Sequence, residues 1–517
     1  MAVSATVENR NGASRGTLAM AVAAFAVCLV TMMTVLDTTI ANVSLATIAG
    51  NIGASSSQAT WVITFYGVAN AVIIPTSGWL AMTVGATRLF SFCTALFVLA
   101  SLLCGLSDSL GMLIACRILQ GAAAGPLMPL SQSLLIDIFP ASRRALALWS
   151  MTMVVAPVLG SILGGTICEN WSWHWVFFVN VPVGLLALVL PKMTLDHEKK
   201  EGTARPMDLP GLLLVVIGIG ALQLMLDEGK DEDWFESIYI CVLAVVAILS
   251  LSLLVFRELA VKTPVVDLRL FANRNFAIGT ICLCAGYGIY FAATLLLPMM
   301  QQGQLGYTAS WAGWALAPVG IIPIVTTPIL GKFSAKLPMR LLASLAFLGI
   351  AVTCWWRSTI APDVDFATIA WQQFWMGLAV AFFLMPVTSI LLSGLTTPED
   401  ATSLSTSLGV LSGSIASSLT TTFWSRREAL HHERLTEAFD GTTTFWADAA
   451  ETLSGAADPS TVVPVLVREI TRQGYLLGFV ELFRAFMILG LLFAAVIWLT
   501  QDPKAGRHPA AQGGAKE

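Results

Sequence analysis

Long apolar segments recur from one end of the 517-residue sequence to the other. A helix of about 20 apolar residues crosses the hydrocarbon core of a bilayer, which is about 30 Å thick. Fourteen segments approach this length, at residues 18–45, 58–81, 88–107, 110–135, 145–168, 174–191, 211–226, 236–256, 276–299, 311–331, 339–356, 367–392, 402–424 and 477–499. The chain is 56% hydrophobic and only 12% charged, against about 25% charged in soluble domains. The sequence therefore predicts an all-α polytopic membrane protein with fourteen transmembrane helices.

The distribution of Lys and Arg predicts the orientation of these helices. With the N-terminus in the cytoplasm, the inside segments hold 19 of these residues and the outside loops hold 7, five of them in one long loop. Cytoplasmic loops normally carry the excess of Lys and Arg. We therefore expect both termini in the cytoplasm. The first apolar run has no convincing cleavage site and is interpreted as a retained helix.

An internal repeat predicts two similar halves. Phe65–Phe90 resembles Ala317–Leu342, since each has an apolar helix with a Pro, a Gly, a short loop, an Arg and a new helix. The similarity pairs the second segment with the tenth and leaves two central segments outside the repeat. Repeated halves of this kind are typical of transporters. The expected organisation is an N-terminal tail (1–17), a six-helix half (18–191), a linker with two extra transmembrane helices (192–275), a second six-helix half (276–499) with a periplasmic loop (425–475), and a C-terminal tail (500–517).

Asp37 is a carboxylate inside the first apolar segment. A charge at a helix centre costs about 2.5–3.5 kcal/mol on insertion scales, so such residues usually have a use. A carboxyl group shielded from water binds a proton readily. Asp37 therefore suits a proton carrier or a counter-charge for a cationic ligand. The alternative is that it caps a helix end, with Thr38 and Thr39 nearby.

Arg117 is a second charge inside an apolar segment, and its partner cannot be read from the sequence. The alternative is that its side chain reaches to a membrane face. Gln120 and Gln132 add polar groups along the same helix, and Asn42 could hydrogen-bond between helices. The candidate substrate-cavity residues are Thr38, Asn42, Gln120 and Gln132.

"APVLGSILGG" (Ala156–Gly165) places Gly160 and Gly164 one helical turn apart, downstream of Pro157. Small residues at this spacing allow close helix packing, and the proline allows a bend. The stretch Asn170–Pro182 collects Trp and Phe side chains at an expected outer boundary, as an aromatic belt does.

The remaining features favour no enzyme and no nucleic-acid partner. The net charge is −4, and no P-loop, nucleophile elbow or metal-ligand spacing is present in the sequence. The nine cysteines are interpreted as packing residues. In the long outer loop, His431 and His432 are adjacent, so a docking surface is favoured over a metal site. We expect no cofactor and no metal, and an ion gradient as the energy source.

Several stretches together carry a family resemblance. In chain order they read LDTTIANVSLATIAG, GWLAMTVGATRLF, RILQGAAAGPLMPLSQSLL, APVLGSILGG and WVFFVNVPVG, followed by PVVDLRLFANRNFAIG and TTTFWSRREALHHERLTE. They resemble the fourteen-span drug:proton antiporters of the major facilitator superfamily, and among them the EmrB-type subunits of tripartite multidrug exporters. The resemblance covers residues 17–500.

The resemblance implies proton-driven export of hydrophobic drugs and toxic compounds across the bacterial inner membrane. It ties Asp37 and Arg117 to proton coupling. It also implies an antiport motif, formed by Pro157, Gly160, Gly164 and Gly165. The implied gating loop consists of Gly78, Gly85 and Arg88. The implied partners are a periplasmic adaptor of the EmrA type and a TolC-like outer-membrane channel.

The sequence departs from the family pattern at Met82 and Thr83, which stand at the usual charged positions of the gating loop. Ser161 stands where the antiport motif commonly has Pro, and Thr406 and Gly409 replace the Asn and Arg of related pumps. Other hypotheses stay open at this point. They are an exporter of one endogenous metabolite or siderophore, a membrane scaffold or receptor without transport, and a nutrient uptake symporter.

Overall fold

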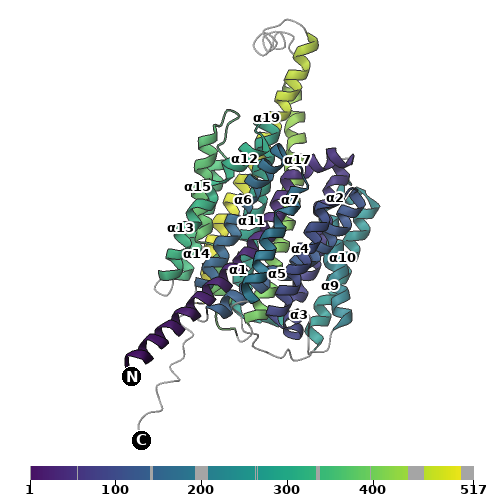
Figure 1. The fold of residues 1–517 in the computed structure, drawn as a ribbon. Helices are drawn as coiled ribbons and strands as arrows, with labels where there is room; N and C mark the ends of the chain where they lie inside the picture. Colours follow the sequence, from purple (N-terminus) through teal and green to yellow (C-terminus); the bar gives the residue numbers. More distant parts are fainter. Residues whose placement is uncertain are drawn as a thin grey trace.

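The computed structural model describes residues 2–54, 56–139, 144–192, 208–261, 264, 266–333, 338–395, 398–439 and 459–501. All regular elements in these ranges are helices (Figure 1). The predicted all-α polytopic membrane fold is confirmed. Twelve helices of the described part are long and apolar enough to cross a membrane.

The first half of the chain forms one set of helices. They are α1 (Ala2–Ile52), α2 (Ser56–Ile73), η1 (Ile74–Thr76), α3 (Ser77–Val84), α4 (Ala86–Gly105), α5 (Leu110–Ile138), α6 (Arg144–Asn170), α7 (Trp175–Phe178) and α8 (Asn180–Lys192). Within this set α1 packs on α6 and α8, and α5 packs on α2 and α4. Gly85 joins α3 to α4 with a φ of 93°, a left-handed conformation that favours glycine.

The second half forms a similar set. Its helices are α11 (Arg274–Gln304), α12 (Ala309–Leu316), α13 (Pro318–Phe333), α14 (Met339–Arg357), α15 (Phe366–Ala381), α16 (Leu384–Leu391), α17 (Pro398–Phe439), α19 (Pro459–Val496) and η4 (Ile497–Leu499). Here α11 packs on α17, α14 on α19, and α13 on α15. Two further helices, α9 (Leu209–Glu228) and α10 (Ile238–Ala260), lie between the halves in sequence, with η2 (Trp234–Glu236) joining them and η3 (Leu268–Ala272) following α10.

All fourteen predicted segments are largely helical, four of them are divided between successive helices, and two, the sixth and the thirteenth, are not among the twelve long apolar spans. The sixth is divided between α7 and α8, which together give the shorter apolar stretch Trp175–Leu190. The thirteenth lies within α17, whose many Ser and Thr side chains lower its hydropathy. α17 continues past the bundle, and the start of α19 packs beside it, at the end opposite the beginning of α1 (Figure 1).

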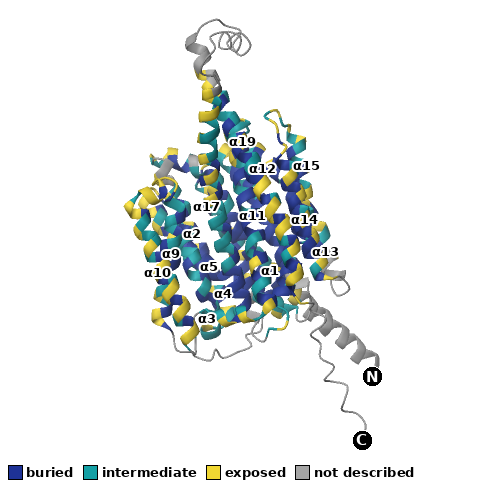
Figure 2. Ribbon diagram, turned by 180° about the vertical axis from the view of Figure 1, so that it is seen from behind, coloured by how far each residue is buried: buried dark blue, intermediate teal, exposed yellow. Residues whose placement is uncertain are grey.

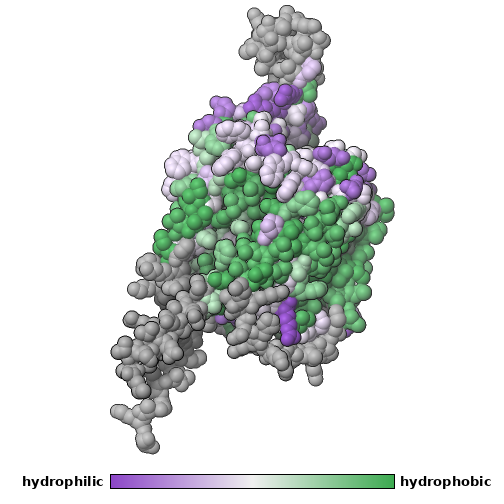
Figure 3. All heavy atoms as spheres, in the orientation of Figure 1, coloured by the Kyte–Doolittle hydropathy of each residue, from purple (hydrophilic) through white to green (hydrophobic). Residues whose placement is uncertain are grey.

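The surface of the bundle is apolar around its middle (Figure 3). The outer face of α10 shows this most clearly, since Ile248 is 66% exposed and Phe256 is 73% exposed. The buried residues are concentrated in the interior of the bundle (Figure 2). An exposed apolar belt of this size fits contact with lipid tails rather than water.

The two halves touch along specific helices. α6 of the first half packs on α12 and α13 of the second, and α17 of the second half packs on α3 and α5 of the first. The α9–α10 hairpin joins the bundle through α9, which contacts both α2 and α17. α9 is therefore in contact with both halves.

Candidate functional site

Asp37 and Arg117 form an ion pair inside the first half. The Arg117 Nη1 atom donates to the Asp37 Oδ2 atom at 2.6 Å, and both side chains are 0% exposed. Asp37 lies in the interior of α1, so the alternative that it caps a helix end is wrong. Arg117 does not reach to a membrane face, since its guanidinium is enclosed on α5. Each charge predicted separately from the sequence is the partner of the other.

Two amides complete the shell of the Asp37 carboxylate. Gln120 Nε2 donates to Asp37 Oδ1 at 2.9 Å, and Asn180 Nδ2 donates to the same oxygen at 2.7 Å. Both amides also reach the Ser101 hydroxyl, at 3.3 and 3.1 Å. Four helices, α1, α4, α5 and α8, therefore hold one carboxylate through side-chain hydrogen bonds.

The guanidinium of Arg117 is fixed by α2 as well. Its Nε donates to the Val62 carbonyl oxygen at 3.1 Å, and its Nη1 also donates to Gln120 Oε1 at 2.9 Å. The Tyr66 ring lies 4.0 Å from the guanidinium carbon, a distance at which the ring face attracts a cation. The Nη2 atom has no hydrogen-bond partner among the described residues.

Sequence reasoning missed Asn180, Ser101 and Tyr66. Asn180 had a signal, because it is the one amide in the otherwise apolar run WVFFVNVPVG, which was interpreted only as an interfacial belt. Ser101 gave no signal, since a lone Ser in a membrane helix commonly bonds its own backbone. In the structure its hydroxyl instead donates to the Phe177 carbonyl oxygen of α7 at 2.9 Å.

The four candidate cavity residues have different surroundings. Gln120 belongs to the ion-pair shell, and Gln132 accepts a hydrogen bond from Thr406 of α17 at 3.0 Å. The Thr38 hydroxyl donates to the Val35 carbonyl oxygen of its own helix at 2.7 Å, and Asn42 is exposed. Gln132 is thus at a contact between the halves.

The glycines of the predicted antiport motif lie against α1. A Cβ added at Gly160 would be 1.8 Å from Thr39 Oγ1 and 3.1 Å from the Leu36 carbonyl oxygen, and one at Gly164 would be 3.2 Å from Ile40 Cα. A side chain at either position would require the Thr39 side chain or the backbone of α1 to shift. Pro157 lies inside α6, and Gly165 is buried on the same helix.

The predicted gating-loop residues lie at the α3–α4 junction. A Cβ at Gly78 would be 3.4 Å from Ser403 Cβ of α17, so the halves approach closely there. Gly85 makes the turn between the helices, and Arg88 is exposed on the first turn of α4.

The predicted outer loop contains two helical extensions within its described part. His431 Nε2 lies 3.2 Å from Glu481 Oε1, and His432 Nδ1 lies 3.7 Å from Glu428 Oε1. The two histidines have different partners, and the part of the chain that the structure describes has no group of three or more metal-ligating side chains that could hold an ion.

Comparison with known proteins decides the family. Residues 27–421 match the model of the Major Facilitator Superfamily. The chain belongs to the major facilitator superfamily. As a member of this family it is a multi-pass membrane transporter and not an enzyme.

Curated relatives place it within the family. The Multidrug export protein EmrB of Escherichia coli K12 is 47% identical, over 92% of this chain and 94% of that protein. The Fatty acid resistance protein FarB of Neisseria gonorrhoeae is 46% identical, over 92% and 95%. The EmrB protein of Haemophilus influenzae is 46% identical, over 93% and 96%. The resemblance to EmrB-type proteins is therefore confirmed.

Solved structures agree in fold. A bacterial homologue of the human lysosomal transporter Spinster superposes with a TM-score of 0.52 at 17% identity, covering 94% of this chain and 99% of that one. The human organic anion transporter TETRAN gives a TM-score of 0.56 at 11% identity, covering 92% and 99%. At these identities the likeness concerns the fold alone.

Proposed function

We propose that this transporter exports hydrophobic drugs and toxic compounds across the bacterial inner membrane in exchange for protons. The buried Asp37–Arg117 pair is the observation that carries the proposal. A carboxylate that must gain and lose a proton needs shelter from bulk water and a partner that favours its charged form. The names of the EmrB relatives support drug export as the activity.

The coupling step follows from the hydrogen-bond geometry. A proton on Asp37 removes the negative charge that Arg117 faces at 2.6 Å, so α1 and α5 lose the ion pair that joins them. Gln120 and Asn180 can still hydrogen-bond the neutral acid, which keeps the carboxyl group in place. The proton and the substrate compete, because each binds better when the other is absent. Entry of the proton is therefore coupled to exit of the substrate.

The packing of α6 relays this change to the rest of the molecule. Gly160 and Gly164 bring α6 into close contact with α1, and another face of α6 packs on α12 and α13 of the second half. A shift of α1 would therefore move α6 and change the contacts of α6 with the second half. The two halves then rock about a site between them, as in alternating access.

The proposal includes the cellular arrangement. Both termini lie in the cytoplasm, as the Lys and Arg distribution indicates. The helical extensions of α17 and α19 then face the periplasm, where an adaptor of the EmrA type would dock and lead to a TolC-like channel. Export of antibiotics by such an assembly would confer resistance.

A second candidate is export of one endogenous metabolite. The FarB relative favours this candidate, because its name concerns resistance to fatty acids rather than to many drugs. The same ion pair would serve both functions, so the difference lies in the substrate site.

Drug efflux and proton movement in inverted vesicles test the proposal. Asp37→Asn keeps the shape of the side chain and removes its charge, and we expect it to abolish proton-coupled efflux of a lipophilic cation. Asp108→Asn is the matched control, since Asp108 is exposed between α4 and α5. Unchanged coupling in a folded Asp37→Asn protein would place the proton site elsewhere.

A further inference from the structure

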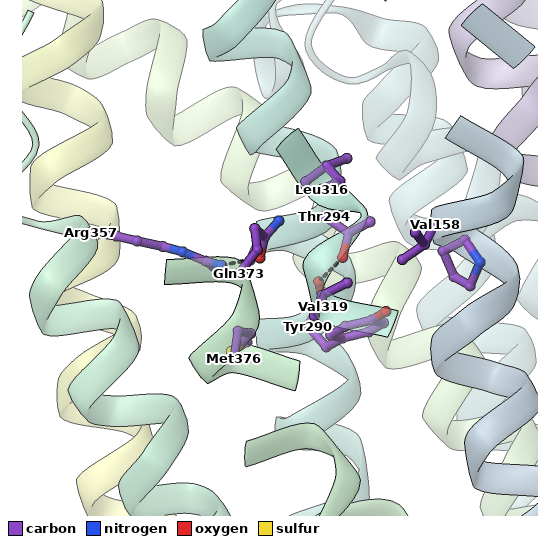
Figure 4. A pocket seen from close by; sticks show the side chains of 10 residues that line it. Val158, Tyr290, Thr294, Leu316, Val319, Arg357, Gln373 and Met376 are labelled. Carbon is purple, nitrogen blue, oxygen red and sulfur yellow. Dashed lines mark hydrogen bonds between the residues drawn. The ribbon is translucent and has the colours of Figure 1, made fainter. Parts of the chain in front are cut away.

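A second buried arginine lies at the boundary between the halves. Arg357 ends α14 and is 1% exposed, and it lines a narrow pocket between α6 and the second half (Figure 4). The wall facing it is largely apolar, with Val158 of α6 on one side and Leu316, Val319 and Met376 on the other. The pocket thus combines one fixed cation with apolar surroundings.

Arg357 lacks the partner that Arg117 has. Among the described residues no carboxylate lies within 4 Å of its guanidinium, whereas Arg117 faces Asp37 at 2.6 Å. The Nη2 atom of Arg357 donates to Gln373 Oε1, and its Nε atom has no hydrogen-bond partner there. The ring of Phe483, 5.5 Å away, is its aromatic neighbour.

An unpaired cation in such a place is costly unless an anion joins it. Burying a charge away from water is strongly unfavourable, and an opposite charge with good hydrogen bonds offsets that cost. The planar guanidinium matches a carboxylate better than any other side chain does. The free donor at Nε is suited to an oxygen atom supplied from outside the protein.

Tyr290 of this pocket also lines a second narrow pocket, with Met153 and Val154 of α6 and Phe291 and Phe383 of the second half. An amphiphilic molecule with its head at Arg357 would place its tail along these side chains. Both pockets are bounded by α6 and by helices of the other half, so their width depends on how the halves are positioned.

We propose that Arg357 and Gln373 form the head-group subsite for hydrophobic organic anions, such as amphiphilic carboxylates. The inference rests on the proposed export function, because it assigns part of the substrate site. It adds a residue in the second half to a mechanism whose proton site lies in the first.

Ligand binding to the purified full chain in lipid nanodiscs tests this subsite. The probes are decanoate and its neutral counterpart decanamide, at a pH where decanoate is ionised. We expect the wild type to bind decanoate at least about ten-fold more tightly than decanamide, as charge-assisted hydrogen bonds imply. Arg357→Gln should remove this preference, and Arg357→Lys should keep part of it. Lys230→Gln, which removes an exposed cation, should leave it unchanged.

Gln373→Glu tests the proposal independently of the loss of Arg357. The new carboxylate would stand where Gln373 meets the guanidinium, supply the missing counter-charge, and compete with the ligand head. We expect weaker decanoate binding, unchanged decanamide binding and no loss of thermal stability. Equal binding of the two probes by the wild type, or an unchanged preference in Arg357→Gln and Gln373→Glu, would overturn the proposal.

Transport separates this inference from the proposed function. Arg357→Gln should lower decanoate export from vesicles at least about ten-fold more than it lowers export of a lipophilic cation, in line with the lost charge-assisted contact. A wild type that exports neither compound would contradict the proposed function, but the binding preference for decanoate would still decide the role of Arg357.

Discussion

At the scale of single residues, the Asp37–Arg117 pair shows what a buried charge requires. Removing two charges from water costs several kcal/mol per ion, which the attraction recovers only with good geometry and satisfied hydrogen bonds. Asp37 receives three side-chain donors, from Arg117, Gln120 and Asn180. The shell is complete on the carboxylate side, while the guanidinium keeps one unused donor at Nη2.

Because each buried charge compensates the other, the pair leads to a double-mutant prediction. Asp37→Leu or Arg117→Leu alone leaves an uncompensated buried charge, and we expect each to lower the free energy of unfolding by about 3–5 kcal/mol. The double variant leaves neither charge and should lose clearly less than the sum of the two. Thermal unfolding of the four proteins in one detergent measures the cycle. Additive losses would mean that the two side chains do not stabilise each other.

The sequence identified the two charges but not their pairing. A charge within an apolar segment stands out because it is costly, and this pointed to both residues separately. Their contact joins positions 80 residues apart, which helix periodicity does not reveal. Arg357 was counted with an outer loop because the expected span ended at 356, whereas α14 continues through it and buries it. A one-residue difference in a helix boundary thus decided whether this cation was noticed.

At the scale of elements, α9 has an unusual position. Its Gln223 Nε2 donates to Ser414 of α17 at 2.5 Å and to Asp227 of its own helix at 3.1 Å, and Ser418 of α17 donates to the Leu226 carbonyl oxygen. α9 also packs on α2, and the same Gln223 lies close to that helix, since a Cβ added at Gly67 would be 3.9 Å from its Nε2 atom. α9 thus packs on α2 and supplies polar bridges to α17.

Asp208 and Arg257 hold the hairpin together at the start of α9. Asp208 accepts from the Gly211 backbone N–H at 3.1 Å, and Arg257 of α10 donates to it at 2.6 Å. The hydrogen bond from Arg257, followed by that from Gly211, lowers the pKa of Asp208 below its ordinary value. The carboxylate is thus both the N-cap of α9 and the ion-pair partner of α10.

We expect Asp208→Ala to destabilise the protein by about 1–2 kcal/mol at neutral pH, the usual effect of losing a helix cap. Because the folded pKa lies below the unfolded value of about 3.9, this contribution is present above that pH and disappears as the pH falls through the folded pKa. Unfolding of both proteins at several pH values measures it. Asp231→Ala, at an exposed acid of the same hairpin, is the control. A stability difference that persists at the lowest pH would contradict this explanation.

Helix positions were more predictable than helix shapes. All fourteen apolar segments are largely helical because each must satisfy its backbone internally in lipid. The division of the sixth at Phe178–Asn180 was not expected, and it is there that Asn180 reaches Asp37. The continuation of the thirteenth to Phe439 could be predicted, since Ser425–Phe439 reads as an amphipathic extension of this span, and α17 does end at Phe439.

At the scale of the whole molecule, the halves meet directly at the end where α17 begins. The Ser77 and Ser403 hydroxyls are 2.9 Å apart, and Thr406 donates to Gln132 at 3.0 Å. Both are hydrogen bonds between uncharged side chains, and the Asp400 carboxylate of α17 lies beside them, since a Cβ added at Gly78 would be 3.6 Å from its Oδ1 atom. A neutral hydrogen bond contributes only about 0.5–1.5 kcal/mol, so these two bonds by themselves hold the halves together weakly.

A reversible cross-link at this contact tests whether opening is needed for transport. The 2.9 Å separation of the two hydroxyl oxygens shows that the Ser77 and Ser403 side chains point toward each other. Cysteines with Cβ atoms about 3.5–4.5 Å apart can form a disulfide. In a background without the nine native cysteines, Ser77→Cys/Ser403→Cys should therefore cross-link on mild oxidation and lose export, and a reductant should restore it.

Each single variant should keep export under both conditions, because neither can join the halves. Full export by a demonstrably cross-linked protein would show that the two halves do not separate here during the cycle, and alternating access would then have to proceed by movement elsewhere, with the α3–α17 contact as a fixed hinge.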